Sequence, residues 1–491
     1  MKRIFWIFTG SLFLWLPLCA QQRQLDLKEA IRIAQLHSVD AAVALNELRT
    51  AYWQYRAYQA DQLPEVVFTG TLPAYNNNYD KYQQSDGSYT YVQDNSLALD
   101  GEVSVNQNIA LTGGKVSLSS SLDFNRQLGT GAYNEFMSLP VSLTLTQPIF
   151  GVNDQKWNRR IEPLRYREAK ASYLESVEDV TVTTITNFFN LLSAQENLEV
   201  AKQNLDNADK LQRIAVARRK IGQISESELM QLNLSALQAK GLLTEAESNL
   251  RAQMFQMRSF LGLSEQDTLV PVLPERIPPM RMDYNEVLEM AQENNAFAKR
   301  MARTQLEADY AVATAKGNLR SISLNASIGY TGTEHTIAGA YNPLRGNQVV
   351  EVGLSIPLLD WGKRKAKVKT AESNRELLLS QNRQEEQNFN QNIFLLVENF
   401  NNQATQLEIA EKADTLASKR YATAIEAFML GHIDILDLND ARNSKDEARL
   451  KHVTELQKYW TYYYDLRGLT LYDFIHHTNL DADFRALIRN K

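Results

Sequence analysis

Carboxylates are the side chains of this sequence best placed to do chemistry, and they follow two short segments that contain glycine. Asp437 and Asp440 are three residues apart in a segment with helical periodicity, so they share one helix face. Glu228 follows a similar glycine segment earlier in the chain. Carboxylates on one helix face make a negatively charged surface, whereas in a first helical turn they also stabilise the helix dipole. The pattern therefore indicates either an electrostatic site or helix capping.

Catalytic chemistry has little support in the sequence. The six histidines show no HExxH or comparable ligand spacing, and no glycine-rich phosphate loop is present. The single cysteine, Cys19, lies in the N-terminal segment discussed next. We therefore expect no enzyme, no metal site and no cofactor.

The N-terminal segment has the pattern of an export signal. Lys2 and Arg3 precede an apolar run that closes with Cys19 and Ala20, which predicts a signal peptide at 1–20 with cleavage after Ala20. Lipidation at Cys19 is the alternative, although Leu-Pro-Leu is a poor sequence before a lipidated cysteine. No further run of about 18 apolar residues follows. An exported chain of this kind is periplasmic, secreted or a β-barrel.

The chain consists of two similar halves. Residues 147–150 align with 356–359, and the same offset aligns 220–225 with 429–434. The stretch between the halves contains four prolines and cannot continue a helix. We therefore predict a first structural repeat at 21–265, an extended linker at 266–281, a second structural repeat at 282–468 and a C-terminal tail at 469–491.

Helical periodicity has the same layout in both halves. Long helices are predicted near 155–220 and 363–429, each about 65 residues or roughly 100 Å long. Shorter helices of about 36 residues, roughly 55 Å, are predicted near 26–62, 225–261, 283–318 and 434–468. Two short helices end to end equal one long helix, which suits the wall of a cylinder. Residues 229–250 have heptad spacing, although an ordinary helical bundle would show the same spacing.

Strand periodicity lies between the helices. Apolar and polar residues alternate over 99–109, 116–125, 139–145, 322–330 and 350–356. One oily and one polar face suits a barrel in lipid, although a soluble sandwich gives the same alternation. The predicted fold class is mixed α and transmembrane β. Tyrosines at 75, 79, 82, 89 and 91 lie in an Asn- and Ser-rich stretch that we expect to be an extracellular loop.

The first repeat is longer than the second between matching positions. From Leu63 to Pro148 it has 47 more residues than the second repeat has from Leu319 to Pro357. The surplus holds two alternating runs joined by Gly113-Gly114, which predicts an extra hairpin. We expect four strands from the first repeat and two from the second. Alternatively, the extra hairpin is an extracellular flap or packs near the barrel base.

Taken together, this order of elements resembles the TolC family of outer-membrane efflux proteins over nearly the whole exported chain. The most specific motifs are the two hairpin turns, Ile221-Gly222 with the following acidic helix start and Leu430-Gly431 with its own. The resemblance implies a homotrimer with a β-barrel in outer-membrane lipid, continuous with an α-helical coiled-coil tunnel in the periplasm. It implies an exit duct for efflux or type I secretion.

The resemblance also implies partners and sites. The partners are a periplasmic adaptor and an inner-membrane transporter of RND, ABC or MFS type, with no nucleic acid. Asp437 and Asp440 fall on an aspartate ring at the tunnel entrance, and Glu228 is the matching acidic position. The adaptor is expected at the hairpin turns, at Lys220, Gly222, Ile224, Ser225, Met429, Gly431 and Asp434.

At the gate the sequence departs from the family. Phe428 and Ile433 replace a tyrosine and an arginine whose hydrogen bonds hold the prototype closed, and neither can form such bonds. Arg218, Arg219 or Lys220 against Asp437 or Glu228 is the candidate replacement. The main rival function is a periplasmic adaptor built on long coiled coils. It explains the heptads and the signal peptide but needs no strands with one oily face.

Overall fold

The computed structural model describes residues 22–129, 131–222, 224–319, 321–355 and 359–489. The expected signal peptide at 1–20 and the repeat landmark at 356–358 lie outside these ranges. The chain divides into two compact units, and each contains parts of both repeats. The helical unit comprises the chain up to Asn46, Ser172–Asn295 and Asn390 onward, and the sheet unit comprises Glu47–Ala171 and Ala296–Phe389.

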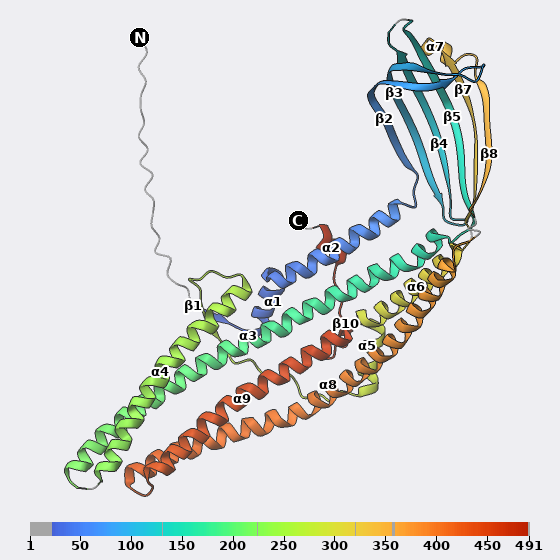
Figure 1. The fold of residues 1–491 in the computed structure, drawn as a ribbon. Coiled ribbons are helices and arrows are strands. Elements are labelled where there is room, and N and C mark those ends of the chain that lie inside the picture. Colours follow the sequence, from blue (N-terminus) through green and yellow to red (C-terminus); the bar gives the residue numbers. More distant parts are fainter. Residues whose placement is uncertain (1–21, 130, 223, 320, 356–358, 490–491) are drawn as a thin grey trace, which may run out of the picture. The chain divides into compact units, whose positions relative to one another are not determined.

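Two long helices each turn back into a shorter one (Figure 1). α3 (Asp154–Lys220) has 67 residues and leads into α4 (Glu226–Leu261) with 36. α8 (Lys363–Leu430) has 68 residues and leads into α9 (Ile435–Thr470) with 36. These bounds confirm the long and short helices predicted at these places. The nearly equal lengths in the two repeats follow from the duplication of the sequence.

The other two predicted helices are each interrupted at one residue. The segment near 26–62 forms α1 (Leu27–His37) and α2 (Val39–Ala60). The segment near 283–318 forms α5 (Tyr284–Asn294) and α6 (Ala296–Gly317). The prediction of continuous helices was therefore wrong at the two breaks.

Both breaks are made by small polar residues that are buried. Ser38 and Asn295 have extended backbones with ψ of 150° and 151°. The Ser38 hydroxyl accepts the Ala41 N–H at 3.1 Å, and the Asn295 side-chain amide donates to the Leu469 carbonyl at 2.8 Å. Serine and asparagine side chains compete with helical backbone hydrogen bonds in this way. The break is thus a feature of both repeats.

Short strands and a tail complete the helical unit. β1 (Gln22–Leu25) pairs in parallel with β6 (Thr268–Pro271) at the start of the predicted linker. After α9 the chain forms β9 (Tyr472–Asp473), β10 (Thr478–Asn479) and α10 (Phe484–Arg489). Among the helices of the described ranges, none combines the length and apolar character needed to cross a membrane.

The sheet unit contains one antiparallel sheet of six strands. Its strands in spatial order are β2 (Glu65–Gln83), β3 (Tyr89–Ile109), β4 (Gly114–Gln127), β5 (Tyr133–Phe150), β7 (Ser321–Glu334) and β8 (Arg345–Ser355). The short helix α7 (Ile337–Ala340) connects the last two strands. Four strands from the first repeat and two from the second confirm the predicted division. β3 and β4 pair between β2 and β5, so the alternative of a flap or a base-packed hairpin is wrong.

The two faces of this sheet differ in polarity and in exposure. Strand register aligns an apolar row on one face, made of Val105, Leu118, Leu143 and Ile328. The adjacent row points to the other face and is made of Ser104, Ser119, Ser142 and Gly329. Leu118 is 46% exposed and Ser104 only 7%. On the concave face of a curved sheet, the neighbouring strands enclose the side chains and reduce their exposure. The polar face is the less exposed one, so it is the concave face.

The tyrosine-rich stretch is strand, contrary to the expected extracellular loop. β2 continues to Gln83 and β3 begins at Tyr89, so only residues 84–88 form the turn. Side-chain hydrogen bonds connect the two strands, from Asn76 to Asp94 at 2.7 Å and from Gln93 to Asn77 at 2.9 Å. Tyrosine favours strands, and these cross-strand bonds offset the weak strand preference of asparagine.

Candidate functional site

The turn between α3 and α4 is held by local hydrogen bonds. Gly222 has a left-handed backbone with φ of 74°, which glycine adopts without a steric penalty. Ser225 caps α4, and Ser225 and Glu228 form a reciprocal capping box. The Ser225 backbone N–H and hydroxyl donate to the Glu228 carboxylate and lower its pKa. Lys220, Gly222, Ser225 and Glu228 are all exposed.

The turn between α8 and α9 has the same backbone but distributes its charges differently. Gly431 is left-handed with φ of 81°, and the Asp434 carboxylate accepts the Asp437 N–H at 2.9 Å. Asp437 is exposed in the first turn of α9. Asp440 forms an ion pair with Arg420 at 2.6 Å. The two predicted entrance carboxylates are therefore unequal, because Arg420 offsets the charge of Asp440.

Apolar side chains join the two hairpin tips. Ala215, Leu232 and Ile435 form a buried cluster, against which Ile224 and Phe428 pack. A second cluster, of Tyr421, Leu438 and Ala441, is in contact with Phe428 and Ile433. Phe428 thus contacts both clusters. Phe428 and Ile433 cannot form the hydrogen bonds expected of the family's tyrosine and arginine, and they make apolar contacts in their place. Ile224, one of the predicted adaptor-contacting residues, is partly buried against the first cluster.

Arg218 forms a hydrogen bond that connects the two hairpins near their tips. Its guanidinium donates to the Met429 carbonyl at 3.0 Å and lies 5.9 Å from the centre of the Phe428 ring. Arg219 pairs with Glu226 of its own hairpin at 3.0 Å. The expected pairing of these arginines with Asp437 or Glu228 is therefore corrected. Sequence reasoning looked for carboxylate partners and could not identify a backbone carbonyl as the acceptor.

The tips also expose apolar side chains that the sequence reasoning did not include among the site residues. Ile221 is 68% exposed and Leu430 is 72% exposed. Met429 beside Leu430, which was already among the predicted adaptor-contacting residues, is exposed as well. The repeat offset already aligns Ile221 with Leu430, each directly before the glycine of its turn, and this was the available signal. Exposed apolar groups at matching positions indicate a contact surface.

A buried charge cluster lies where α3, α9 and the C-terminal tail meet. Glu178 is 4% exposed, and its carboxylate lies 3.5 Å from the Arg467 guanidinium. Burial raises the pKa of Glu178 to about 7, although Arg467 acts in the opposite direction. Burial also acts on Asp473, but hydrogen bonds from His476 and Tyr463 and the charge of Arg467 hold its pKa at about 2. No periodicity in the sequence pointed to this cluster.

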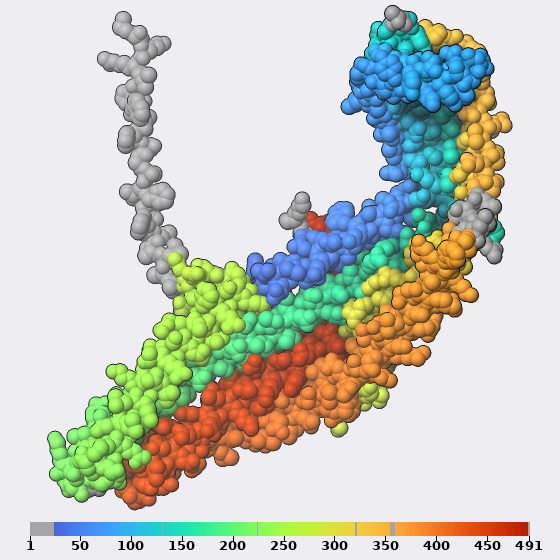
Figure 2. Space-filling view, in the orientation of Figure 1, coloured from blue at the N-terminus to red at the C-terminus, as the bar shows by residue number. Residues whose placement is uncertain are grey.

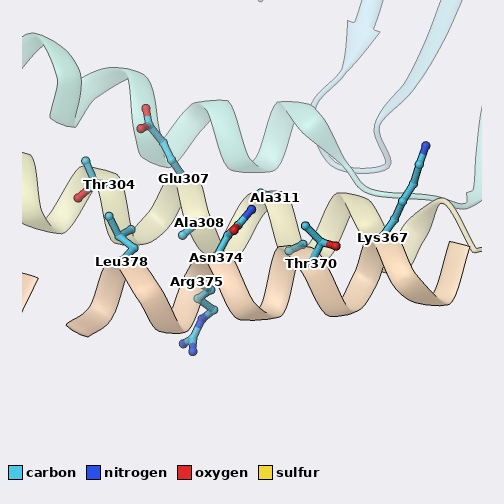
Figure 3. A pocket seen from close by; sticks show the side chains of 10 residues that line it. Thr304, Glu307, Ala308, Ala311, Lys367, Thr370, Asn374, Arg375 and Leu378 are labelled. Atoms are coloured by element: carbon cyan, nitrogen blue, oxygen red, sulfur yellow. The ribbon is translucent and has the colours of Figure 1, made fainter. Parts of the chain in front are cut away.

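A groove of about 510 Å³ lies between α6 and α8 in the sheet unit (Figure 3). Its lining combines small residues such as Ala308 and Thr370 with charged ones. The charged Arg375 is paired with Asp309 at 2.5 Å, and Glu307 is paired with Arg165 and Arg303. The pairs Arg375–Asp309 and Arg165–Glu307 connect neighbouring helices, so the groove is a seam of helix packing.

Comparisons with known proteins agree with this geometry. The sequence matches the family model described as outer membrane efflux protein over residues 30–263 and 287–470. The two matched stretches fall in the two predicted repeats. Among curated proteins, no sequence is matched.

Solved structures with the same fold are outer-membrane channels. The Campylobacter jejuni CmeC outer membrane channel has a TM-score of 0.66 at 14% identity, covering 94% of this chain and 88% of that chain. The outer membrane protein VceC from Vibrio cholerae has a TM-score of 0.63 at 14% identity, covering 93% of this chain and 97% of that chain. At such identities the likeness shows a shared fold.

Proposed function

This chain belongs to the outer membrane efflux protein family, matched over both repeats, and we propose that three copies of it close into one conducting duct. The protein is a channel-tunnel of the outer membrane whose helical part lies in the periplasm. The curved sheet is the observation that best supports a trimer. Its outer strands β2 and β8 have no further strand beside them in the described residues. Open sheet edges are normally paired or covered.

Three such sheets joined edge to edge make a barrel of about 18 strands. The apolar row that contains Leu118 and Ile328 faces outer-membrane lipid, and the polar row that contains Ser104 and Ser142 lines the pore. The alternation along each strand matches that of membrane barrels. The pore is therefore wide and lined mostly by small hydroxyl side chains at this level.

At the periplasmic end, the hairpin tips dock onto an adaptor protein. Ile221, Met429 and Leu430 supply apolar contact, and Lys220, Ser225 and Asp434 supply polar contact around the left-handed Gly222 and Gly431. Three copies would present six tips, so the adaptor surface is a ring of apolar sockets that each take one tip. The adaptor connects the duct to an inner-membrane transporter of the RND, ABC or MFS type.

The same tips form the entrance. Asp437 and Glu228 are exposed carboxylates at matching helix starts, and three copies of each give the entrance a negative potential that favours cations. Arg218 on the Met429 carbonyl, with Phe428 and Ile433 in the apolar clusters, holds the two hairpins of one protomer together. Separation of these contacts opens the entrance.

A two-part experiment tests this assembly. Mature protein is extracted with detergent from outer membranes, and its mass is measured by light scattering with the detergent contribution subtracted. The trimer predicts three chains per particle and a large, steady conductance in planar bilayers. A monodisperse monomer would contradict the assembly, and an intact trimer without conductance would contradict the duct.

A further inference from the structure

The hairpin formed by β2 and β3 is longer than a membrane requires. β2 has 19 residues and β3 has 21, whereas a membrane strand needs about 9–11. We call residues 74–97 the distal hairpin. It begins after the register shift between Thr71 and Ala74, so it lies beyond the part of the sheet whose faces alternate between apolar and polar rows.

A defined bend separates the distal hairpin from the rest of the sheet. Gly70 pairs with Gly101 across the two strands, and the Phe68 ring lies against both glycines. Just beyond them, Leu72 and Pro73 have no pairing partners on β3. Glycine pairs and bulges bend strands, and proline has no N–H to continue the ladder. The sequence itself therefore specifies the bend.

The bend carries the distal hairpin across the concave side of the sheet. Figure 1 shows β2 and β3 turning sharply at their upper ends, and Figure 2 shows the same residues crossing in front of the hollowed face. The concave face is the polar face that lines the proposed pore. Five tyrosines of the distal hairpin are 57–68% exposed, at positions 75, 79, 82, 89 and 91. So many exposed rings on one segment indicate an absent partner.

The hairpin is long enough to reach the centre of the proposed barrel. About 18 strands spaced ~4.8 Å apart and tilted by ~40° enclose a circle of roughly 18 Å radius. Ala74 to Gln83 is ten residues of strand, which at ~3.3 Å each spans roughly 33 Å. The reach exceeds the radius. Hairpins from three protomers therefore meet over the axis.

We propose that the distal hairpins of three copies of this chain pack on one another and cap the outer mouth of the pore. The partner of each hairpin is the same hairpin of a neighbouring protomer, and the exposed tyrosines form the contact. Tyrosine gives large contact areas at a low cost in side-chain entropy. Cross-strand hydrogen bonds from Asn76 and Gln93, and Lys81 over the Tyr89 ring at 4.0 Å, stiffen each hairpin. The inference rests on the proposed trimer.

Cross-linking tests the contact between copies. In a Cys19→Ser background, Ser85→Cys places one thiol in the turn of each hairpin, and Leu111→Cys places one in the exposed turn between β3 and β4 as a control. Outer membranes are treated with a short bis-maleimide, and the products are separated on denaturing gels. The cap predicts covalent dimers and trimers for Ser85→Cys but monomers for Leu111→Cys. An intact trimer whose Ser85→Cys chains remain monomeric overturns the cap and leaves the duct unaffected.

Conductance tests what the cap does. One variant replaces residues 77–95 with Asn-Gly, which closes a two-residue hairpin after the Asn76 and Ser96 pair. A second variant keeps the hairpin and changes Tyr79, Tyr82 and Tyr91 to Ser. The cap predicts a severalfold higher single-channel conductance for the first variant and a smaller rise for the second. Unchanged conductance in both trimers overturns it.

Two further outcomes would overturn the cap for different reasons, one through the trimer and one through the partner of the tyrosines. If detergent-extracted protein is a monomer, the assembly itself fails and the cap fails with it. If lipopolysaccharide protects Ser85→Cys from a maleimide while no neighbouring chain cross-links, the tyrosines contact outer-leaflet sugars, and the contact between copies is overturned.

Discussion

The two hairpin tips share their backbone and apolar packing but not their charges. The sequence offset that aligns Ser225 with Asp434 also aligns Arg218 with Ala427, so the second repeat has no counterpart of the hydrogen bond from Arg218 to the other hairpin. It aligns Asp440 with Gln231, so the ion pair with Arg420 exists only in the second repeat. Duplication has therefore preserved the apolar contacts, whereas the charged contacts differ between the copies.

The same contrast holds for the sheet and the buried cluster. The repeats contribute long and short helices of nearly equal length, but four strands of the six-stranded sheet against two. Glu178 of the first repeat aligns with Gln387 of the second. Helices that pack side by side must match in length, whereas strands and polar side chains can change in one repeat alone. Substitutions can test this difference in two ways. They either introduce the residue of the other repeat, or they compare the effects of the same change at two nearby positions.

The largest effect is expected in the sheet. Leu118→Arg places a charge on the apolar face, and Ser119→Arg places it on the polar face of the same strand. An arginine facing lipid costs roughly 2–4 kcal/mol at the bilayer midplane, and three copies in a trimer multiply that cost. Urea unfolding in lipid vesicles should show a strong loss of stability for Leu118→Arg and a small one for Ser119→Arg. Equal losses would mean that the faces are assigned incorrectly.

The next effect concerns Glu178 and depends on pH. Its pKa is raised to about 7 in the folded protein, so the native state binds a proton more tightly than the unfolded state does. Stability is therefore highest below about pH 4.5 for this group and falls as pH rises toward 7. Glu178→Gln introduces the second-repeat residue and should stabilise the protein at pH 8 by roughly 3 kcal/mol at most.

Urea midpoints at pH 5 and pH 8 check this prediction, because the gain of Glu178→Gln should be much smaller at pH 5. Asp473 supplies the contrast. Its pKa of about 2 means that its stabilising contribution is present above about pH 4 and is lost only at lower pH. Asp473→Asn should therefore destabilise the protein at both pH values. A gain for Glu178→Gln that does not change with pH would contradict the titration of this carboxylate.

A smaller effect is expected at the tips. Arg218→Ala introduces the second-repeat residue and removes the hydrogen bond to the Met429 carbonyl, worth about 1 kcal/mol, or about fivefold in the ratio of open to closed entrance. Arg219→Ala is the matched control, because its partner Glu226 lies in the same hairpin. Single-channel recordings should show longer openings for Arg218→Ala only. Similar openings in the two variants would place the restraint elsewhere.

The smallest effect concerns ion selectivity. Asp437→Asn should reduce the preference for cations more than Asp440→Asn, because Arg420 already offsets the Asp440 charge. Arg420→Ala should increase the preference. The differences amount to a few tenths of a kcal/mol at exposed sites and shrink as salt is raised. Reversal potentials in asymmetric KCl measure them, and an unchanged preference in all three variants would restrict these residues to capping and surface charge.

Periodic features of the sequence predicted most of the fold. Helical periodicity predicted the long helices to within a few residues, and alternation with the Gly113-Gly114 turn identified the extra hairpin. Ser38 and Asn295 were missed because one buried polar residue changes the backbone without changing the apolar period. The tyrosine stretch was taken for a loop because its asparagines weaken strand propensity, and only the hydrogen bonds to the opposite strand offset that weakness.

The site was predicted less completely for a different reason. Capping by Ser225 and the left-handed turns at Gly222 and Gly431 are local and could be read directly. Arg218 acts on a backbone carbonyl 211 residues away, and Glu178 meets Arg467 across the fold. Such contacts depend on tertiary placement. No spacing along one segment encodes them.

The extra hairpin also has an evolutionary consequence. Because a hairpin returns the chain to the side from which it started, its insertion leaves the next helix pointing in the original direction. In the proposed trimer, one insertion event in the gene adds six strands to the circumference at once and leaves both hairpin tips unchanged. The outer aperture can therefore change in width while the surface proposed to recognise the adaptor stays the same.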